Sequence, residues 1–344
     1  MKIGVRLPHT GPFASPDAIR RVAVLAEDLG YDSLWVRDSL TRNREDVRAH
    51  FTAGSVEAWD RVEEPIEPNL FESVTTLAYV AGLTKHVRLG TAVLLPPLRH
   101  PVWLAKYFAT MDQLSGGRMI LGIGTGSPPY AKAELAALGR PELLGRRGRL
   151  VDEWITIMRS VWQDDVTSFD GEFITVEGAQ VFPKPVQCPL PILYGGTGER
   201  VMRRIAKRLD GWFPIFLAPD VIAAGRRQLE ELAQEHGRQP SELQVVSENW
   251  LSVDDDAARA AGRVARIDDA LFEHARKMAD PTRMTEDHKA YEKMERESLA
   301  GPPEAIRELL GRYEEAGVDT LVLRVVADDL DEMLEQLVRF RERV

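Results

Sequence analysis

The residues most suited to chemistry form a glycine-rich run at positions 195–199, Gly-Gly-Thr-Gly-Glu, between a predicted strand and a predicted helix at about 200–208. Glycines let backbone N–H groups approach an anion closely, and the N-terminus of the following helix adds the positive end of its dipole. The pattern favours a phosphate-binding loop over a tight turn without a ligand. The predicted contacts are Gly195, Gly196, Thr197 and Gly198.

A second glycine-rich run, Gly-Ile-Gly-Thr-Gly-Ser, occupies positions 122–127 after another predicted strand. A dinucleotide-binding fingerprint would need a third glycine where Ser127 stands, and Pro128 and Pro129 interrupt the helix start that should hold the pyrophosphate. The run therefore predicts a close-packed loop at the end of a strand and argues against dinucleotide binding.

Three polar residues stand at the ends of predicted strands, and we predict catalytic roles for them. His9 follows the first strand, where an imidazole can exchange a proton near neutral pH; the alternative is a polar surface residue. Asp38 closes the second strand, and a structural cap is its alternative. Arg324 closes the last strand, where its guanidinium can bind a carboxylate or phosphate; an internal ion pair is the alternative.

Other chemistries have little support in the sequence. The seven histidines include no His-Glu-x-x-His motif, and there is no Gly-x-Ser-x-Gly elbow, so we predict neither a metal site nor a serine hydrolase.

Cys188 is the only cysteine, which excludes an internal disulfide and fits a reducing compartment. A net charge of −10 argues against nucleic acid and anionic membranes as partners. No run is long enough to span a membrane, so we expect a cytoplasmic protein.

The elements that must position these residues alternate along the whole chain. Short β-branched runs are separated by amphipathic helical segments, which is the pattern of a parallel sheet with crossover helices. Eight such runs predict a single (β/α)8 TIM barrel over residues 1–344. The predicted strands are 2–7, 33–36, 87–95, 118–123, 191–194, 211–215, 243–253 and 320–326.

Three stretches interrupt the alternation and are predicted to be insertions after strands two, four and seven. They cover residues 41–69, 167–189 and 254–301. The middle one predicts a hairpin that turns at Asp170 and Gly171. The last one is dense in charge and predicts a mobile helix or lid.

Several segments occur together in an order that resembles the bacterial-luciferase-like flavin-dependent oxidoreductases. The likeness spans nearly the whole chain apart from the insertions. It rests on residues 30–38 (Gly-Tyr-Asp-Ser-Leu-Trp-Val-Arg-Asp), 88–94 (Arg-Leu-Gly-Thr-Ala-Val-Leu), 99–101, 104–106, 111–118, 182–187, 194–199, 206–212 and 321–324.

The resemblance implies a barrel with a reduced flavin or deazaflavin across the C-terminal ends of its strands. It assigns the phosphate to the loop at 195–198, and it places a backbone bulge at Thr91 and Ala92 under the cofactor ring. Gly124 and Thr125 would line the ring pocket, and Asp38 would lie near the ring. The chain departs from the pattern in two places. Ser39 stands where many relatives carry His, and Gly148 stands where some flavin-mononucleotide relatives place a Tyr on the phosphate.

The functional prediction follows from that resemblance. We expect a flavin-dependent monooxygenase that uses reduced FMN, supplied by a flavin reductase, and oxygen on a small organic substrate, in a homodimer. One alternative is a deazaflavin-dependent dehydrogenase or reductase. The N-terminal runs Arg6-Leu7-Pro8 and Gly11-Pro12 resemble those of family members that are often assigned to deazaflavin. The others are a non-catalytic flavin-binding barrel and a phosphate-binding barrel with lyase or isomerase chemistry.

Overall fold

The computed structural model describes residues 1–11, 13–41, 69–126, 128–265 and 297–344. The predicted insertion at 41–69, and residues 266–296 of the insertion at 254–301, therefore lie almost wholly outside the described residues. Within the described part of the chain, no helix is long and apolar enough to cross a membrane.

Eight parallel strands close into a barrel, as predicted. Each strand pairs with the next along the order β1-β3-β5-β6-β9-β10-β11-β13, and β13 pairs with β1. The closed ring of strands confirms the TIM-barrel prediction, and each of the eight predicted strands is present. The barrel strands are β1 (Lys2–Arg6), β3 (Ser33–Val36), β5 (Arg88–Thr91), β6 (Met119–Ile123), β9 (Ile192–Gly195), β10 (Gly211–Phe213), β11 (Gln244–Val253) and β13 (Thr320–Val325).

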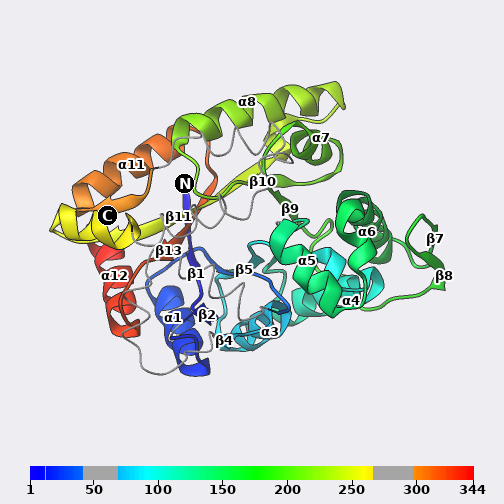
Figure 1. Ribbon diagram of the computed structural model, residues 1–344, viewed down its shortest axis with the longest axis horizontal. Helices are drawn as coiled ribbons and strands as arrows, with labels where there is room; N and C mark the ends of the chain where they lie inside the picture. Colours follow the sequence, from blue (N-terminus) through cyan, green and yellow to red (C-terminus); the bar gives the residue numbers. More distant parts are fainter. Residues whose placement is uncertain (12, 42–68, 127, 266–296) are drawn as a thin grey trace.

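Helices surround the strands on the outside (Figure 1). Most of them bury one apolar face against the barrel wall, which is the usual way for a parallel sheet to be covered. The helix Pro128–Ala137 instead packs against the 3-10 turns Pro96–Leu98 and Pro141–Arg146. The helices are α1 (Pro16–Asp28), α3 (Ser73–Leu83), α4 (Pro101–Ser115), α5 (Pro128–Ala137), α6 (Arg147–Gln163), α7 (Glu199–Arg208), α8 (Pro219–Glu235), α11 (Pro303–Glu315) and α12 (Leu330–Arg343), with 3-10 turns η1 (Pro96–Leu98), η2 (Pro141–Arg146) and η3 (Pro240–Glu242).

The first helix shows how local sequence fixes an element. The Ser15 hydroxyl accepts a hydrogen bond from the backbone N–H of Ala18, Pro16 occupies the first turn, and Asp17 adds negative charge at the positive end of the helix. Gly30, with φ of 72°, turns the chain toward β3 immediately after the helix.

The inside of the barrel is packed around Trp35. Its indole fits because Gly4 and Gly90 lack side chains: a Cβ at Gly90 would lie 2.3 Å from the indole, and one at Gly4 would lie 2.7 Å from its nitrogen. The indole nitrogen donates to Ser33 Oγ at 2.8 Å. The apolar layer around the ring consists of Ala92, Ile120, Leu193, Phe213, Val246 and Val322. Because side chains alternate along strands, this layer identifies the inward-facing positions of each strand.

Additional short strands decorate the barrel. The predicted hairpin is present as β7 (Thr167–Asp170) and β8 (Thr175–Ala179), and it projects from one edge of the molecule (Figure 1). The sequence did not predict β2 (Thr10–Gly11), β4 (Asn69–Leu70) or β12 (Leu299–Gly301). These strands have two or three residues, so no alternating pattern can develop within them.

Candidate active site at the barrel mouth

Three charged residues occupy inward-facing positions just above the apolar layer. Glu248 on β11 lies two positions after Val246, and Arg324 on β13 lies two positions after Val322; both valines belong to the layer. Arg6 on β1 lies two positions after Gly4, which pairs with Val322. Glu248 is only 1% exposed, and its carboxylate pairs with the guanidinium of Arg6. Arg324 Nη1 lies 3.8 Å from Glu248 Oε1. The floor of the mouth is therefore polar and charged.

Aromatic rings form a wall beside this floor. The rings of Phe216 and Trp250 stack with centroids 4.7 Å apart, and the Arg324 guanidinium lies 4.2 Å from the Trp250 ring centroid. A cation over an aromatic face is held in place by the ring quadrupole. Arg324 thus lies at the mouth, where the sequence predicted it. The alternative prediction for Arg324, an internal ion pair, also applies, because Glu248 lies within ion-pair distance.

The backbone at the end of β5 leaves the regular strand. The sequence predicted a strand as far as 95, but β5 ends at Thr91 and the peptide bond between Ala92 and Val93 is cis. Arg6 donates a hydrogen bond to the Ala92 carbonyl at 2.9 Å. The strand is shorter than predicted because its pairing changes here, with Leu94 N–H donating to the Gly122 carbonyl at 2.8 Å.

Two glycines make room for the Val93 side chain beside this distortion. A Cβ at Gly124 would lie 2.8 Å from a methyl of Val93, and a Cβ at Gly195 would lie 2.9 Å from the other methyl. Thr125 follows Gly124, and its side chain lies next to that of the buried Tyr194. Residues 91–93, 124–125 and 195 therefore come together at one side of the mouth, where the resemblance assigns the cofactor ring.

The glycine-rich run at 195–198 connects β9 to α7 as an open loop. Gly196 has φ of 122° and Gly198 has φ of 93°, which side chains rarely tolerate. Gly196 is exposed, and α7 starts after Gly198 with no side chain capping its first N–H groups. Uncapped N–H groups at a helix start are anion-binding groups. The loop therefore presents backbone N–H groups that could bind an anion, and we call residues 195–198 the cradle.

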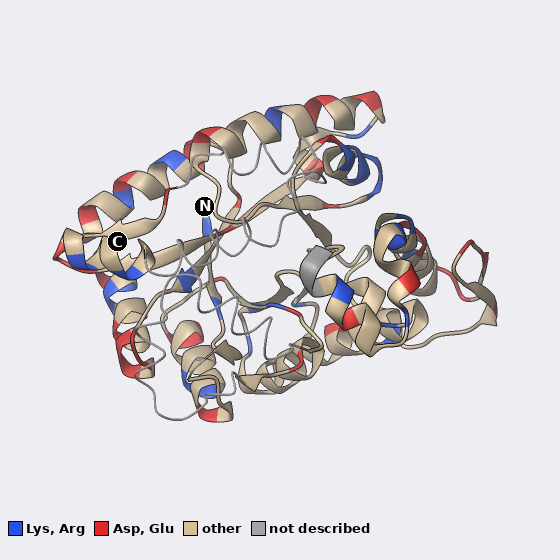
Figure 2. Ribbon diagram, in the orientation of Figure 1, with Lys and Arg blue, Asp and Glu red and all other residues tan. Residues whose placement is uncertain are grey.

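Cationic side chains gather beside the cradle. Figure 2 shows that α7 carries a dense group of lysines and arginines. Arg204 on this helix binds both carboxylate oxygens of Asp152, at 2.7 and 3.0 Å, and its Nη2 lies 3.3 Å from the Gly148 carbonyl. A Cβ at Gly148 would lie 3.4 Å from the same guanidinium. Arg204 therefore fills the space beside Gly148.

Residues 1–320 match the family model described as luciferase-like monooxygenase. The chain belongs to the luciferase-like family. The prediction of that family from ordered sequence motifs is confirmed.

Among luciferase-like relatives, the F420-dependent glucose-6-phosphate dehydrogenase of Kineococcus radiotolerans is 30% identical over 253 residues, which are 72% of this chain and 67% of that protein. An uncharacterized protein of Mycobacterium tuberculosis is 33% identical over 223 residues, 61% of this chain and 76% of its own length. Both relatives support the family assignment.

Two solved structures share the luciferase-like fold over all of this chain and 98% of their own. An F420-dependent secondary alcohol dehydrogenase in complex with an F420-acetone adduct has a TM-score of 0.76 at 21% identity. The monooxygenase RslO1 from Streptomyces bottropensis has a TM-score of 0.75 at 20% identity. At these identities the likeness concerns the fold.

His9 lies at the end of β1 in this luciferase-like barrel but is buried, with 1% of its surface exposed. Its Nδ1 lies 3.0 Å from the Leu7 carbonyl, and its Nε2 lies 2.9 Å from the Arg37 carbonyl and 3.1 Å from the Arg37 N–H. Burial lowers the pKa of His9 to about 4. The imidazole is neutral at pH 7 and ties β1 to the end of β3, which favours a structural role.

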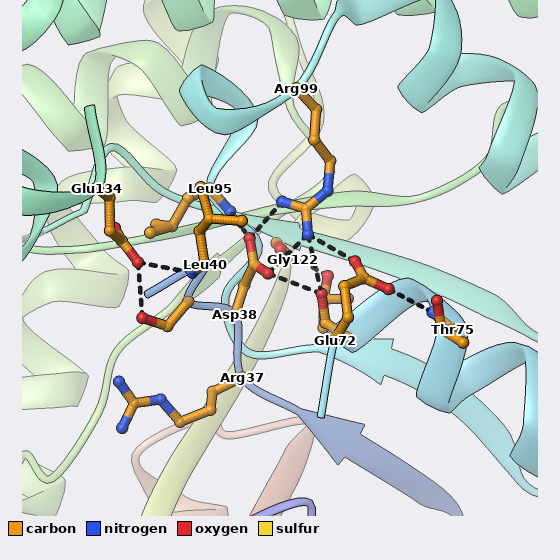
Figure 3. A network of polar contacts seen from close by, with 12 residues as sticks. Arg37, Asp38, Leu40, Glu72, Thr75, Leu95, Arg99, Gly122 and Glu134 are labelled. Atoms are coloured by element: carbon orange, nitrogen blue, oxygen red, sulfur yellow. Dashed lines mark hydrogen bonds and ion pairs between the residues drawn. The ribbon is translucent and has the colours of Figure 1, made fainter. Parts of the chain in front are cut away.

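Asp38 lies at the centre of the polar network in Figure 3. Its carboxylate pairs with Arg99 Nη1 at 2.6 Å and Nη2 at 2.8 Å, and it accepts hydrogen bonds from Ser73 Oγ at 2.8 Å and the Leu95 N–H at 2.9 Å. Arg99 also pairs with Glu72 at 2.7 Å. With four donors on two oxygens, Asp38 fixes the ends of β3 and β5 relative to each other.

Sequence reasoning missed several residues of the mouth, above all Arg6, Glu248 and Glu134. A signal was present for the first two, because Arg6 directly follows the apolar run Ile3-Gly4-Val5 in β1 and Glu248 is the only charged residue of β11. A charge at an inward-facing barrel position is costly unless it is paired. Glu134 carried no such signal, since a glutamate on a helix is ordinarily solvated.

Proposed function

We propose that this luciferase-like chain is an oxidoreductase that uses a deazaflavin coenzyme to move a hydride to or from a small organic substrate. The observation that carries the cofactor class is the cradle at 195–198, whose exposed backbone and uncapped helix start fit the phosphate of a flavin-type coenzyme. A deazaflavin is favoured because the 30% identical relative from Kineococcus radiotolerans is a dehydrogenase that depends on the deazaflavin F420.

The chain's own residues would hold and orient the reactants. Gly195, Gly196, Thr197 and Gly198 would receive the phosphate, and the surfaces of Thr91, Ala92, Gly124 and Thr125 would support the ring. When bound, the coenzyme supplies hydride chemistry, and the protein contributes position and electrostatics. Arg324 would orient a carbonyl, hydroxyl or carboxylate of the substrate. His9 and Asp38, predicted as catalytic, are proposed to position the strand ends around the reactants.

A reduced-FMN monooxygenase with a separate flavin reductase is the second candidate. The stacked pair Phe216 and Trp250 favours it, because a dry aromatic wall would limit the access of water to a reactive oxygen species. The same cradle would accept the phosphate of FMN. Arg204, which lies against Gly148 and is held by Asp152, would be a cation on the helix that starts at that phosphate.

Parallel titrations with the two cofactors test the proposal. We expect the purified chain to bind oxidised F420 with a change in its fluorescence, and to reduce it when a panel of primary and secondary alcohols is added. Binding of FMN alone, with oxygen consumption when reduced FMN and an aldehyde or alcohol are supplied, would establish the second candidate. Failure to bind either cofactor would overturn both, and binding without turnover would leave a non-catalytic barrel.

A further inference from the structure

Glu134 on α5 presents a buried carboxyl group at the end of β3. Its surface is 1% exposed, although it belongs to a helix that lies over the barrel rim. Its Oε1 accepts hydrogen bonds from Ser39 Oγ at 2.6 Å and from the Leu40 N–H at 2.9 Å (Figure 3). Its Oε2 is buried and has no hydrogen-bond partner among the described residues. A buried oxygen without a donor costs free energy when the group is ionised.

The surroundings of Glu134 favour its protonated form. Burial raises the pKa of the Glu134 carboxyl, and the nearby Asp38 carboxylate raises it further. The hydrogen bonds from Ser39 and Leu40 and the charge of Arg37 act in the opposite direction without reversing the shift. Glu134 therefore keeps its proton at higher pH than an exposed glutamate does.

Ser39 connects this carboxyl group with the mouth. It follows Asp38 at the C-terminal end of β3, where catalytic groups of barrels gather, and it is half-exposed. A hydroxyl donates one proton and can accept another hydrogen bond at the same time. Ser39 Oγ lies 2.6 Å from Glu134 Oε1 and 3.5 Å from the Thr41 carbonyl, so its single proton is donated to the nearer carboxylate oxygen. The lone pairs of Ser39 then remain available to a group that lies in the mouth.

We propose that Glu134 is the proton-holding residue of the active site and that Ser39 relays the proton to and from the substrate. This inference rests on the proposed function. In alcohol oxidation, the substrate O–H bond breaks and its proton passes to Ser39 Oγ, while the proton of Ser39 passes to Glu134. The carbon–hydrogen bond breaks with its electron pair leaving as hydride to the oxidised deazaflavin, and the carbonyl double bond forms. Reduction of a carbonyl runs the same transfers backwards.

Carboxyl titration of the full chain, labelled with ¹³C at the glutamate carboxyl carbon, tests the pair without any substrate. We expect one resonance to titrate above the ordinary glutamate value of about 4.3, and to disappear in Glu134→Gln. Ser39→Ala should raise that pKa further, because the carboxylate loses a donor. Glu72 is the matched control from the same neighbourhood: hydrogen bonds from Thr75 and Arg99 outweigh its burial and lower its pKa. An ordinary value for Glu134, or no response to Ser39→Ala, overturns the proposal.

Loading with oxidised deazaflavin and turnover separate this inference from the proposed function. The Glu134 resonance should shift when F420 binds, and with an alcohol that the enzyme oxidises, Glu134→Gln should lower kcat about 100-fold and remove the acidic limb of its pH profile. KM and the affinity for F420 should change little. If F420 does not bind the native chain, the proposed function fails. If F420 binds but the acidic limb persists in Glu134→Gln, only the relay fails.

Discussion

His9 is kept neutral by its burial between β1 and β3. Its pKa is about 4 in the folded chain and about 6.5 in an unfolded one. A base with a lowered folded pKa contributes stability that is fully present above pH 6.5 and is lost as the pH falls toward 4, because the unfolded chain then binds the proton more readily.

Replacing this histidine therefore changes the pH dependence of stability. Between pH 6.5 and 4, the free energy of unfolding of the native chain should fall by about 1.4 kcal/mol per pH unit more than that of His9→Asn. Urea denaturation at several pH values measures the difference. Parallel stability curves for the two proteins would show that His9 does not titrate as its surroundings imply.

The pair of Asp38 and Arg99 is the second prediction at this scale. Asp38→Asn leaves Glu72 as the remaining charged partner of Arg99 among the described residues, and we expect a loss of roughly 3 kcal/mol in the free energy of unfolding. Asp17→Asn is the control, because it removes an exposed pair with Arg20 at 2.6 Å and should cost less than about 1 kcal/mol. Equal losses would mean that the buried network has no special role in stability.

Among the elements, the loop between β9 and α7 has the most specific geometry. A side chain at Gly196 would strain a backbone with φ of 122° and change the direction of the N–H groups that start α7. Since an anion held by such groups gains about 1.5–3 kcal/mol per hydrogen bond, Gly196→Ala should weaken cofactor binding at least about tenfold. Fluorescence titration measures this affinity.

Gly237 provides the matched control for that variant. It also has a positive φ, of 71°, but it follows α8, where an added Cβ meets nothing within 4 Å. Gly237→Ala introduces backbone strain away from the cradle, smaller than the strain at Gly196, and should leave cofactor affinity unchanged. Similar losses of affinity in both variants would assign the effect to general destabilisation.

At the scale of the whole molecule, one outer face of the barrel is unusually apolar. On α4, Trp103 is 60% exposed, Tyr107 is 41% exposed and Leu114 is 78% exposed, and Tyr79 on the adjacent α3 is 44% exposed. The rings of Trp103 and Tyr107 stack with centroids 5.6 Å apart. Soluble monomers seldom leave large apolar groups clustered on one face.

We therefore expect this face to be buried between two copies of the chain, in line with the predicted homodimer. Light scattering should give twice the mass of the 38.6 kDa chain, and Trp103→Glu should shift the equilibrium to the monomer. Val166→Glu is a control, because Val166 is also exposed, at 50%, but lies near the β7–β8 hairpin. A monomeric native chain would refute the expectation.

The positions of the barrel strands could be predicted from the sequence because they follow local pattern. β-branched runs, the amphipathic helical segments between them and the glycines at 195–198 each act through neighbours a few residues away. The family could be predicted for a related reason, since its motifs are short and keep their order along the chain.

Only the tertiary structure decided what surrounds each functional side chain. Arg6 and Glu248 are 242 residues apart, and Ser39 and Glu134 are 95 residues apart, yet each pair is in hydrogen-bond contact. Burial and long-range partners set the pKa values of His9 and Glu134, and neither is visible in local sequence. Arg324 and the glycines at 195–198 could therefore be predicted from the sequence, whereas Arg6, Glu248 and Glu134 were missed, because their places at the mouth depend on how the closed barrel brings distant strands and helices together.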